Sequence, residues 1–432
     1  MNETNDTGNI IVALDLGSSH LTMMAGRVLA DKTVEILGVE RERCRGLATK
    51  GILDNPNEVA TRIVRMCKQL KNRIGTLQPL NKIFVTLGGK GLHVTEAEVE
   101  RSLEPVNHVS DKILREMEQE CRNKFERSYQ QFSVAEVIWE NFILDNKIET
   151  NDPSDQRAKR IKGTYEVYYG PAGMRYNWDE CIGKQDQLQV ESYFVNTEAL
   201  RTALINSDEE QEGCAIINFG SDTTTFCAYY HGKLLDLCVV PLGSHNITKD
   251  IAYKAISITD ADKLKERHTS LITPQNVSSV RVNSAVQPDE DVFFRTDTLS
   301  NIAAEREKEI LEPILQHIDE NIEILENKTL YITGGGALQK GLIPFLQNII
   351  PMDVRMGTFI ERLSEYSNNK YASPEYAQIV GTIMLAAEYY DNIPQTKPTT
   401  NKKEKKTKKE KSFGGRLINL LFQDNNDNDL AE

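Results

Sequence analysis

Two stretches of this sequence, about 200 residues apart, repeat one plan, and the repeat limits the folds that the chain can adopt. In residues 11–28, IVALDLGSSHLTMMAGRV, an apolar run enters a polar turn with one glycine and leaves it as a second apolar run. Residues 215–243, AIINFGSDTTTFCAYYHGKLLDLCVVPLG, follow the same plan and add a third apolar run after HGK. Backbone N–H groups and hydroxyls in such turns can hold a phosphate. The repeat therefore predicts two related domains that face each other.

A third glycine turn ends the apolar strand TLYITGGG, residues 329–336. The residues that follow, ALQKGLIPFLQNII, have the apolar spacing of a helix over 337–350. A strand, a glycine turn and a helix in this order allow a ligand to lie close to the backbone. Further helices are expected at 57–73, 247–255 and 260–267, behind the two repeated units.

The region between the repeated units has a different pattern and predicts a small α+β insertion of roughly 80 residues. Residues 109–125 have helical spacing, whereas FSVAEVIWENFILDN, residues 132–146, alternates as a strand does. The insertion ends in a polar loop, ETNDPSDQRAKRIKG, at residues 149–163.

Composition narrows the class of protein further. The 432 residues suffice for about three domains. Seven scattered cysteines without a CxxC pair argue against a disulfide framework or a zinc site. The beginning, MNETNDTGNI, lacks the regions of a signal peptide, and no run approaches the roughly 20 apolar residues of a membrane span. We therefore expect a cytoplasmic protein, and its net charge of −13 disfavours nucleic acid as a partner.

The last part of the chain predicts a tether and a docking helix. Residues 391–411, with seven lysines between 402 and 411, read as a disordered linker, and 412–424 as an amphipathic helix with Arg416 on its polar face. So short a helix is marginal alone in water. An anionic membrane is the expected partner, because each nearby lysine adds about 1 kcal/mol. The alternatives are a helix bound to a partner protein or folded back on the body. The residues expected at the membrane are Phe413, Arg416, Leu417, Ile418, Leu420, Leu421 and Phe422.

Together, the three glycine turns resemble the phosphate 1, phosphate 2 and adenosine motifs of the actin, Hsp70 and sugar-kinase superfamily. Within it the chain is similar to the bacterial FtsA family, on VALDLGSSHLT, VPLGSHNITKDIAYKAISITDADKLKERH, LYITGGGALQKGL and YAQIVGTIMLA. The insertion resembles that family's subdomain 1C, which replaces actin's 1B, and the C-terminal linker and helix resemble its membrane anchor. The resemblance implies an α/β, actin-like two-domain fold of duplicated ribonuclease H-like domains, with the inserted 1C subdomain and the C-terminal helix.

The same resemblance implies the domain boundaries. Subdomain 1A is expected to be built from three separate segments, and 2A from two. The expected segments are 1–84 (1A, phosphate 1 loop), 85–163 (1C), 164–200 (1A), 201–245 (2A, phosphate 2 loop), 246–320 (2B), 321–360 (2A, adenosine loop), 361–390 (1A), 391–411 (linker) and 412–424 (membrane helix).

By this resemblance, ATP with Mg²⁺ would lie between the two halves. Asp15 would hold the metal through water, since Mg²⁺ keeps much of its hydration shell. His20 stands where many relatives have a lysine or another polar residue, and a structural histidine is an equal alternative. Asp262 and Lys265 match an acid-x-x-Lys pair that handles ribose and adenine, although alone they would be an ordinary surface ion pair. The implied nucleotide contacts are Asp15, Gly17, Ser18, Ser19, His20, Gly220, Ser221, Asp222, Thr223, Thr224, Gly243, Asp262, Lys265, Gly334, Gly335 and Gly336.

Two amides depart from the family pattern. Asn218 stands in the second phosphate loop where relatives usually carry aspartate, and Asn196 where the connecting segment often has glutamate. An amide cannot act as a general base, and phosphoanhydride hydrolysis depends on positioned water. We therefore expect no enzyme, or at most a slow ATPase, that retains nucleotide binding. The alternative is that Asp222 substitutes from within the loop.

The resemblance implies an ATP-binding protein that polymerises into actin-like filaments and tethers the FtsZ ring to the cytoplasmic face of the membrane at the division site. The C-terminal peptide of FtsZ would bind residues 246–318, with Arg295, Leu299 and Arg306 as contacts, and later division proteins would bind the insertion near 91–162. The alternatives are a small-molecule kinase of the same superfamily and an actin-like relative that assembles pili.

Overall fold

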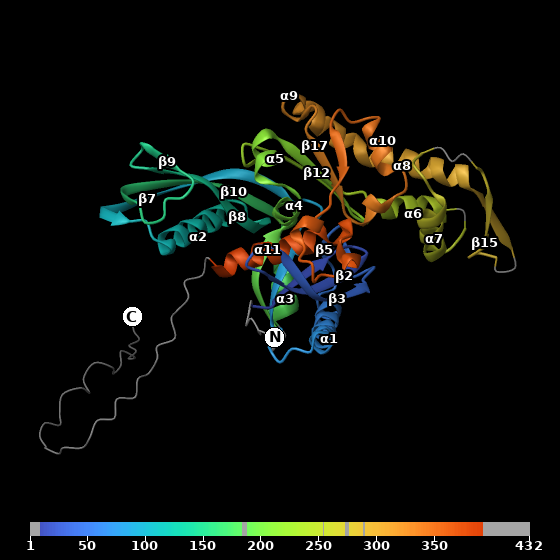
Figure 1. Ribbon diagram of the computed structural model, residues 1–432, viewed down its shortest axis with the longest axis horizontal. Coiled ribbons are helices and arrows are strands. Elements are labelled where there is room, and N and C mark those ends of the chain that lie inside the picture. The colour runs from blue at the N-terminus through green and yellow to red at the C-terminus, as the bar shows by residue number, and fades with distance from the viewer. Residues whose placement is uncertain (1–8, 184–187, 254, 273–275, 288–289, 392–432) are drawn as a thin grey trace, which may run out of the picture. The chain divides into compact units, whose positions relative to one another are not determined.

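Two five-stranded sheets of the same design form the centre of the structure, a computed structural model that describes residues 9–183, 188–253, 255–272, 276–287 and 290–391 (Figure 1). In each sheet three antiparallel strands precede two parallel ones along the chain. The first has the order β11-β6-β1-β2-β3, with β1 Ile11–Leu16, β2 His20–Val28, β3 Val34–Arg43, β6 Lys82–Leu87 and β11 Gln189–Val195. The second has the order β14-β13-β12-β17-β18, with β12 Cys214–Phe219, β13 Thr224–Tyr230, β14 Lys233–Val240, β17 Thr329–Thr333 and β18 Asp353–Met356.

The two polar turns are built alike, which confirms the predicted repeat. Gly17 N–H donates to the carbonyl of His20, and Gly220 N–H donates to the carbonyl of Thr223, both at 2.9 Å. Each turn is therefore closed by a backbone hydrogen bond between its glycine and the residue three positions later. Asp15 on β1 and Asn218 on β12 occupy equivalent places, because each is the penultimate residue of its strand.

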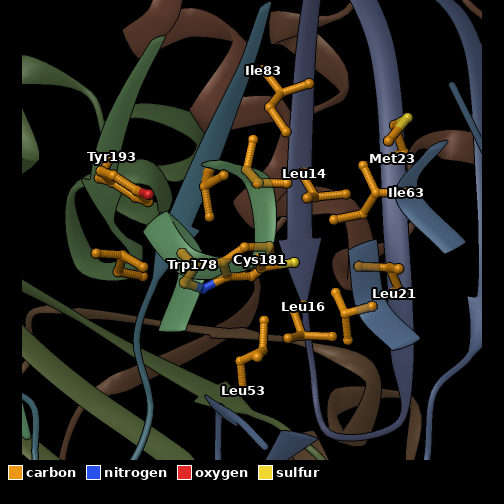
Figure 2. Close-up of a cluster of buried hydrophobic side chains, with 14 of the residues drawn as sticks. Leu14, Leu16, Leu21, Met23, Leu53, Ile63, Ile83, Trp178, Cys181 and Tyr193 are labelled. Carbon is orange, nitrogen blue, oxygen red and sulfur yellow. The ribbon is translucent and has the colours of Figure 1, made fainter. Parts of the chain in front are cut away.

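The first half places its core between sheet and helices. Helix α1 (Pro56–Ile74) begins at Asn55, whose Oδ1 accepts from Glu58 N–H at 3.2 Å, and ends at Gly75 with a φ of 65°. Figure 2 shows Leu14 and Leu21 of the sheet in a cluster with side chains of α1 and α3. The remaining elements here are β4 Ala48–Thr49, β5 Ile52–Leu53, α3 Gly173–Gly183, α4 Asn196–Leu204, η2 Ile360–Arg362, η3 Asn369–Tyr371, η4 Pro374–Tyr376 and α11 Ala377–Asp391. Helix α5 (Ser207–Glu212) packs against β13 of the second sheet.

The insertion is α+β, as predicted. A four-stranded sheet in the order β7-β10-β8-β9 is packed by one helix, and the two share a core of their own that includes Phe125 and Phe142. The helix continues to Ser128, beyond the end at residue 125 that the spacing indicated. The elements are β7 His93–His108, α2 Asp111–Ser128, β8 Phe132–Leu144, β9 Ile148–Thr150 and β10 Arg157–Pro171.

Three buried carboxylates lie where the insertion meets the rest of the chain. Glu166 of β10 accepts from Tyr168 Oη at 2.8 Å and from Leu234 N–H of β14 at 3.2 Å. Glu198 of α4 pairs with Arg201 at 2.8 Å. Glu136 of β8 accepts from Val195 N–H at 2.6 Å. Burial raises the pKa of all three carboxyls, that of Glu136 to about 8.

Glu136→Gln is expected to remove part of the pH dependence of stability. Because burial raises its pKa in the folded protein, Glu136 keeps its proton above pH 4.5, where the unfolded chain loses it. The free energy of unfolding should thus fall as the pH rises from about 5 to 8, by at most about 1.4 kcal/mol for each pH unit. Urea unfolding at pH 5.5 and 8.5 should show a smaller loss in Glu136→Gln. Equal losses in both proteins would contradict this prediction.

The second half differs from the sequence prediction in two places. The helix expected over 337–350 is broken, because Gly341 adopts a φ of 80°, and only its second part is α-helical. The polar segment before residue 295 forms an antiparallel hairpin that its composition did not indicate. The elements are α6 Ser244–Ala252, α7 Ile258–His268, β15 Ser279–Asn283, β16 Asp291–Arg295, α8 Thr296–Glu320, α9 Ile322–Leu325, η1 Gly335–Leu338 and α10 Leu342–Gln347.

The predicted linker and membrane helix, residues 391–424, lie outside the described residues except at residue 391. Among the helices of the described ranges, none combines the length and apolar character that a bilayer crossing needs.

Candidate functional site

One cleft of about 450 Å³ collects the three glycine turns that the sequence singled out. Its walls come from the β1–β2 turn, the β12–β13 turn, the loop after β17, helix α7 and the start of α11. The predicted residues that line it are Asp15, Gly17, Ser18, Ser19, His20, Gly220, Ser221, Thr223, Asp262, Lys265, Gly334, Gly335 and Gly336.

Three predicted residues do not line the cleft. Thr224 is fully buried and its Oγ1 donates to the carbonyl of Leu242 at 3.0 Å. Gly243 lies behind the second turn, against the carbonyl of Ser221. Asp222 is half-buried within the β12–β13 turn but is not part of the cleft wall, so the structure offers no support for Asp222 as a replacement carboxylate.

Asp15 is the carboxylate at the end of β1, and it is held by a neighbour on the last helix. Gln378 Nε2 donates to Asp15 Oδ1 at 2.7 Å. Burial raises the pKa of this carboxyl to about 6, while Arg41 and the Gln378 hydrogen bond act in the opposite direction. A bound cation would favour the ionised form further.

A row of arginines beside the first turn was missed by the sequence reasoning. Arg41 and Arg43 alternate along β3, so both face the cleft, and Arg45 follows. Arg41 pairs with Glu375 at 2.7 Å, whereas Arg43 has no ion-pair partner within the described ranges. The alternation in VERERCR was the signal that could have revealed them.

His20 lies opposite Arg43 in the β2–β3 ladder, and its Nδ1 is 3.4 Å from Arg41 Nη2. Burial, and then the three arginines, lower the pKa of His20 to about 4. The ring is therefore neutral at physiological pH in the ligand-free protein. It can contribute a hydrogen bond to a phosphate, but no charge.

Asp262 and Lys265 form the predicted ion pair on α7, at 3.2 Å, and both side chains are mostly buried. Asp262 also accepts from Thr248 Oγ1 at 2.8 Å and pairs with Arg45 at 2.6 Å. Burial raises the pKa of Asp262, but Lys265, Thr248 and Arg45 outweigh it, and the net shift is downward. The pair is thus built into the cleft, unlike an exposed ion pair worth little.

Both departing amides lie in the cleft. Asn196 begins α4, and its buried Oδ1 has no hydrogen-bond partner within the described part of the chain. Asn218 Nδ2 donates to Gln378 Oε1 at 3.3 Å. Gln378, which lies in the segment YAQIVGTIMLA but was not predicted as a site residue, therefore contacts both Asp15 and Asn218.

The partner-binding prediction needs a correction. Leu299 is fully buried in the core of the second half, so its side chain is not available at the surface. Arg295 is exposed and pairs with Asp297 at 2.6 Å, and Arg306 pairs with Asp250 at 2.7 Å. The expected membrane contacts between residues 413 and 422 lie outside the described residues.

The duplicated sheets and the cleft between their turns define an actin-like fold, and solved structures share this fold. The chain superimposes on the "PilM-PilN type IV pilus biogenesis complex" with a TM-score of 0.61 and 14% identity, over 87% of this chain and 98% of that one. It also superimposes on MreB5 of Spiroplasma citri bound to ADP, with a TM-score of 0.54 and 10% identity, over 89% and 98%.

The sequence comparisons are more specific than the structural ones and point to similarity with one family. Residues 215–381 match the family model "Cell division protein FtsA". Proteins of that name from Bacillus subtilis (24% identical, 88% of this chain and 84% of the relative) and Borreliella burgdorferi (23%, 96% and 99%) match nearly throughout. The predicted resemblance is confirmed: the chain is similar to FtsA proteins over most of its length.

Proposed function

We propose that the chain is an ATP-binding, actin-like assembly protein of bacterial cell division, which tethers the FtsZ ring to the cytoplasmic face of the membrane. The observation that carries the proposal is the cleft lined by two equivalent polar turns and the glycine loop after β17. The names of the relatives support it, as do the structures of MreB5 of Spiroplasma citri bound to ADP and to AMPPNP.

The residues present fit a nucleotide with Mg²⁺. The two turns would hold the phosphates, Asp15 would face the metal through water, and Asp262 with Lys265 would hold the adenosine. The unpartnered Oδ1 of Asn196 is a buried acceptor in the cleft wall, and such an atom calls for a bound water or ligand group. Bound Mg²⁺ would neutralise phosphate charge.

Binding of MgATP tests the core of the proposal. Asp262→Asn should weaken the affinity about tenfold, because a charged hydrogen bond contributes about 1.5–3 kcal/mol. Asp260→Asn is the matched control, because Asp260 begins the same helix but lies outside the cleft. Isothermal titration calorimetry would measure both variants. Failure of the unaltered protein to bind MgATP would refute the proposal.

Slow turnover is expected from the two amides. Asn218→Asp should increase the rate of ATP hydrolysis at saturating nucleotide by about tenfold or more, because a carboxylate can orient the attacking water. Phosphate release under single-turnover conditions is the measurement. An unchanged rate would mean that position 218 does not limit hydrolysis.

Membrane attachment is proposed for the C-terminal segment. We expect the full chain to sediment with anionic vesicles and a chain ending at Lys397 to remain in the supernatant. Neutral phosphatidylcholine vesicles serve as the control, because the lysines before residue 412 would gain nothing from them. If both chains remain in the supernatant with anionic vesicles, the tether proposal fails.

We propose that Arg295 and Arg306 contact the acidic, apolar C-terminal peptide of FtsZ. We also propose that the insertion binds later division proteins and that the chain self-associates into filaments. Titration of the labelled FtsZ peptide against Arg295→Glu, with Arg281→Glu as the control, would test the first contact. The small-molecule kinase is the less favoured function, because Asn196 and Asn218 are amides at two cleft positions where a catalytic carboxylate would be expected.

A further inference from the structure

Gln378 connects the strand ends that lead into the two polar turns. It is the second residue of α11, and its Nε2 donates to Asp15 Oδ1 at 2.7 Å. Its Oε1 accepts from Asn218 Nδ2 at 3.3 Å. Because Asp15 and Asn218 occupy equivalent places in the duplicated sheets, one side chain joins the first half to the second.

The three groups are complementary in hydrogen bonding. A primary amide offers donors at one end and an acceptor at the other, whereas an ionised carboxylate only accepts. Asp15 therefore determines which end of the Gln378 amide faces it, and the carbonyl end is left to find a donor. Asn218 supplies that donor. An aspartate at position 218 would place an acceptor against an acceptor in a half-buried setting, which is unfavourable.

Two contacts of α11, with β6 and with α4, hold the backbone of Gln378 in place. Thr382 Oγ1, one turn further along α11, lies 2.8 Å from the Gln378 carbonyl and 2.7 Å from Thr86 Oγ1 of β6. Gly381 allows α11 to pack directly against the backbone of α4 at Ala199. The side chain of Gln378 therefore reaches the cleft from a fixed base.

We propose that Gln378 is a positioning residue: it holds the carboxylate of Asp15 in one orientation and, through Asn218, ties together the strand ends of the two halves. Asn218 is then the matched partner of Gln378 rather than the remnant of a lost carboxylate. The tie requires no nucleotide. The benefit of an oriented Asp15 for a metal-bound nucleotide rests on the proposed function.

The first experiment uses the full-length protein without nucleotide, and its readout is the midpoint of thermal unfolding. Gln378→Glu should lower the midpoint by several degrees, because a second carboxylate then faces Asp15. Adding Asp15→Asn to this variant should raise the midpoint most of the way back, because the new amide at position 15 and that of Asn218 would both donate to the glutamate. Asp15→Asn alone should cause little loss, because Gln378 can donate to its carbonyl.

A second pair of variants tests the hydrogen bond between Gln378 and Asn218. Asn218→Asp should lower the midpoint in the original background and have little effect beside Asp15→Asn, where the amide of Gln378 can turn around. Unchanged midpoints for Gln378→Glu and Asn218→Asp would overturn the tie. A lower unfolding midpoint of Gln378→Glu that Asp15→Asn does not reverse would also overturn the tie.

The second experiment measures the affinity for a fluorescent ATP analogue with Mg²⁺ and with EDTA. Gln378→Leu should reduce the Mg²⁺-dependent gain in affinity about tenfold and change the affinity in EDTA less than about twofold. An equal loss in both conditions would indicate a merely structural residue and overturn the positioning role. If the unaltered protein binds no nucleotide, the proposed function fails, while the unfolding experiment still decides whether the tie exists.

Discussion

Gly381→Ala is expected to lower the free energy of unfolding by about 3 kcal/mol or more. Gly381 lies on α11 at its crossing with α4, and an added β-carbon would overlap the carbonyl oxygen of Ala199 and lie 2.6 Å from its carbonyl carbon. Both obstacles are backbone atoms, so no side-chain rotation can make room. The two helices would have to separate, and each carries a residue of the cleft: Asn196 on α4 and Gln378 on α11.

Guanidinium unfolding followed by circular dichroism would measure this loss. Gly183→Ala is the matched control, because Gly183 ends a helix and a β-carbon there meets no atom of the described residues within 4 Å. The control should be neutral or slightly stabilising, since alanine is the better helix former. Similar unfolding midpoints for both variants would show that α11 does not pack against α4 as closely as we describe.

Gly334→Ala should reduce both stability and nucleotide binding, and the neighbouring Gly335→Ala should leave the fold intact. Gly334 has a φ of 85°, which disfavours any other residue, and a β-carbon would overlap Asn218 Oδ1 and lie 2.5 Å from the carbonyl oxygen of Phe219. Strain at such a position and the backbone overlap together are expected to lower stability by about 2–4 kcal/mol. Displacing the loop would also move the end of the cleft where we propose that adenosine binds.

At Gly335 a β-carbon meets nothing within 4 Å in the described part of the chain, although the residue lines the cleft. Gly335→Ala should thus unfold at the same temperature as the original protein, and any loss it shows should be in ATP affinity alone. Thermal unfolding and calorimetric titration of both variants would separate the two roles. If Gly335→Ala destabilised the protein as much as Gly334→Ala, the stated geometry of the loop would be wrong.

Local sequence signals located most of the cleft. The two polar turns were recognisable because an apolar strand, a glycine and a row of hydroxyls occur within about ten residues of one another. The pair Asp262 and Lys265 was implied by the family resemblance, and the i, i+3 spacing places both residues on one helix face. The same signals failed where backbone conformation changed abruptly: the left-handed Gly341 ends the regular spacing of 337–350, and the pattern alone could not show it.

The sequence also did not reveal which residues of a helix are buried. Leu299 and Arg306 are seven residues apart on α8 and so lie on nearly the same face, yet one is fully buried in the core and the other pairs with Asp250 of α6. Helical spacing predicts which residues share a face, but it does not say how deeply the rest of the chain covers each of them. The choice of Leu299 as a surface contact was wrong for that reason.

What the sequence determined by itself is the set of short-range structures: the duplicated strands, their phosphate-type turns and the amides at positions 196 and 218. Only the tertiary structure decided what those amides do. Gln378 is 363 residues from Asp15 and 160 from Asn218, and no periodicity relates the three. Their contacts arise because the last helix packs against β1 and, through Gly381, against α4. A hydrogen bond between distant residues depends on how elements pack, and packing is a property of the whole fold.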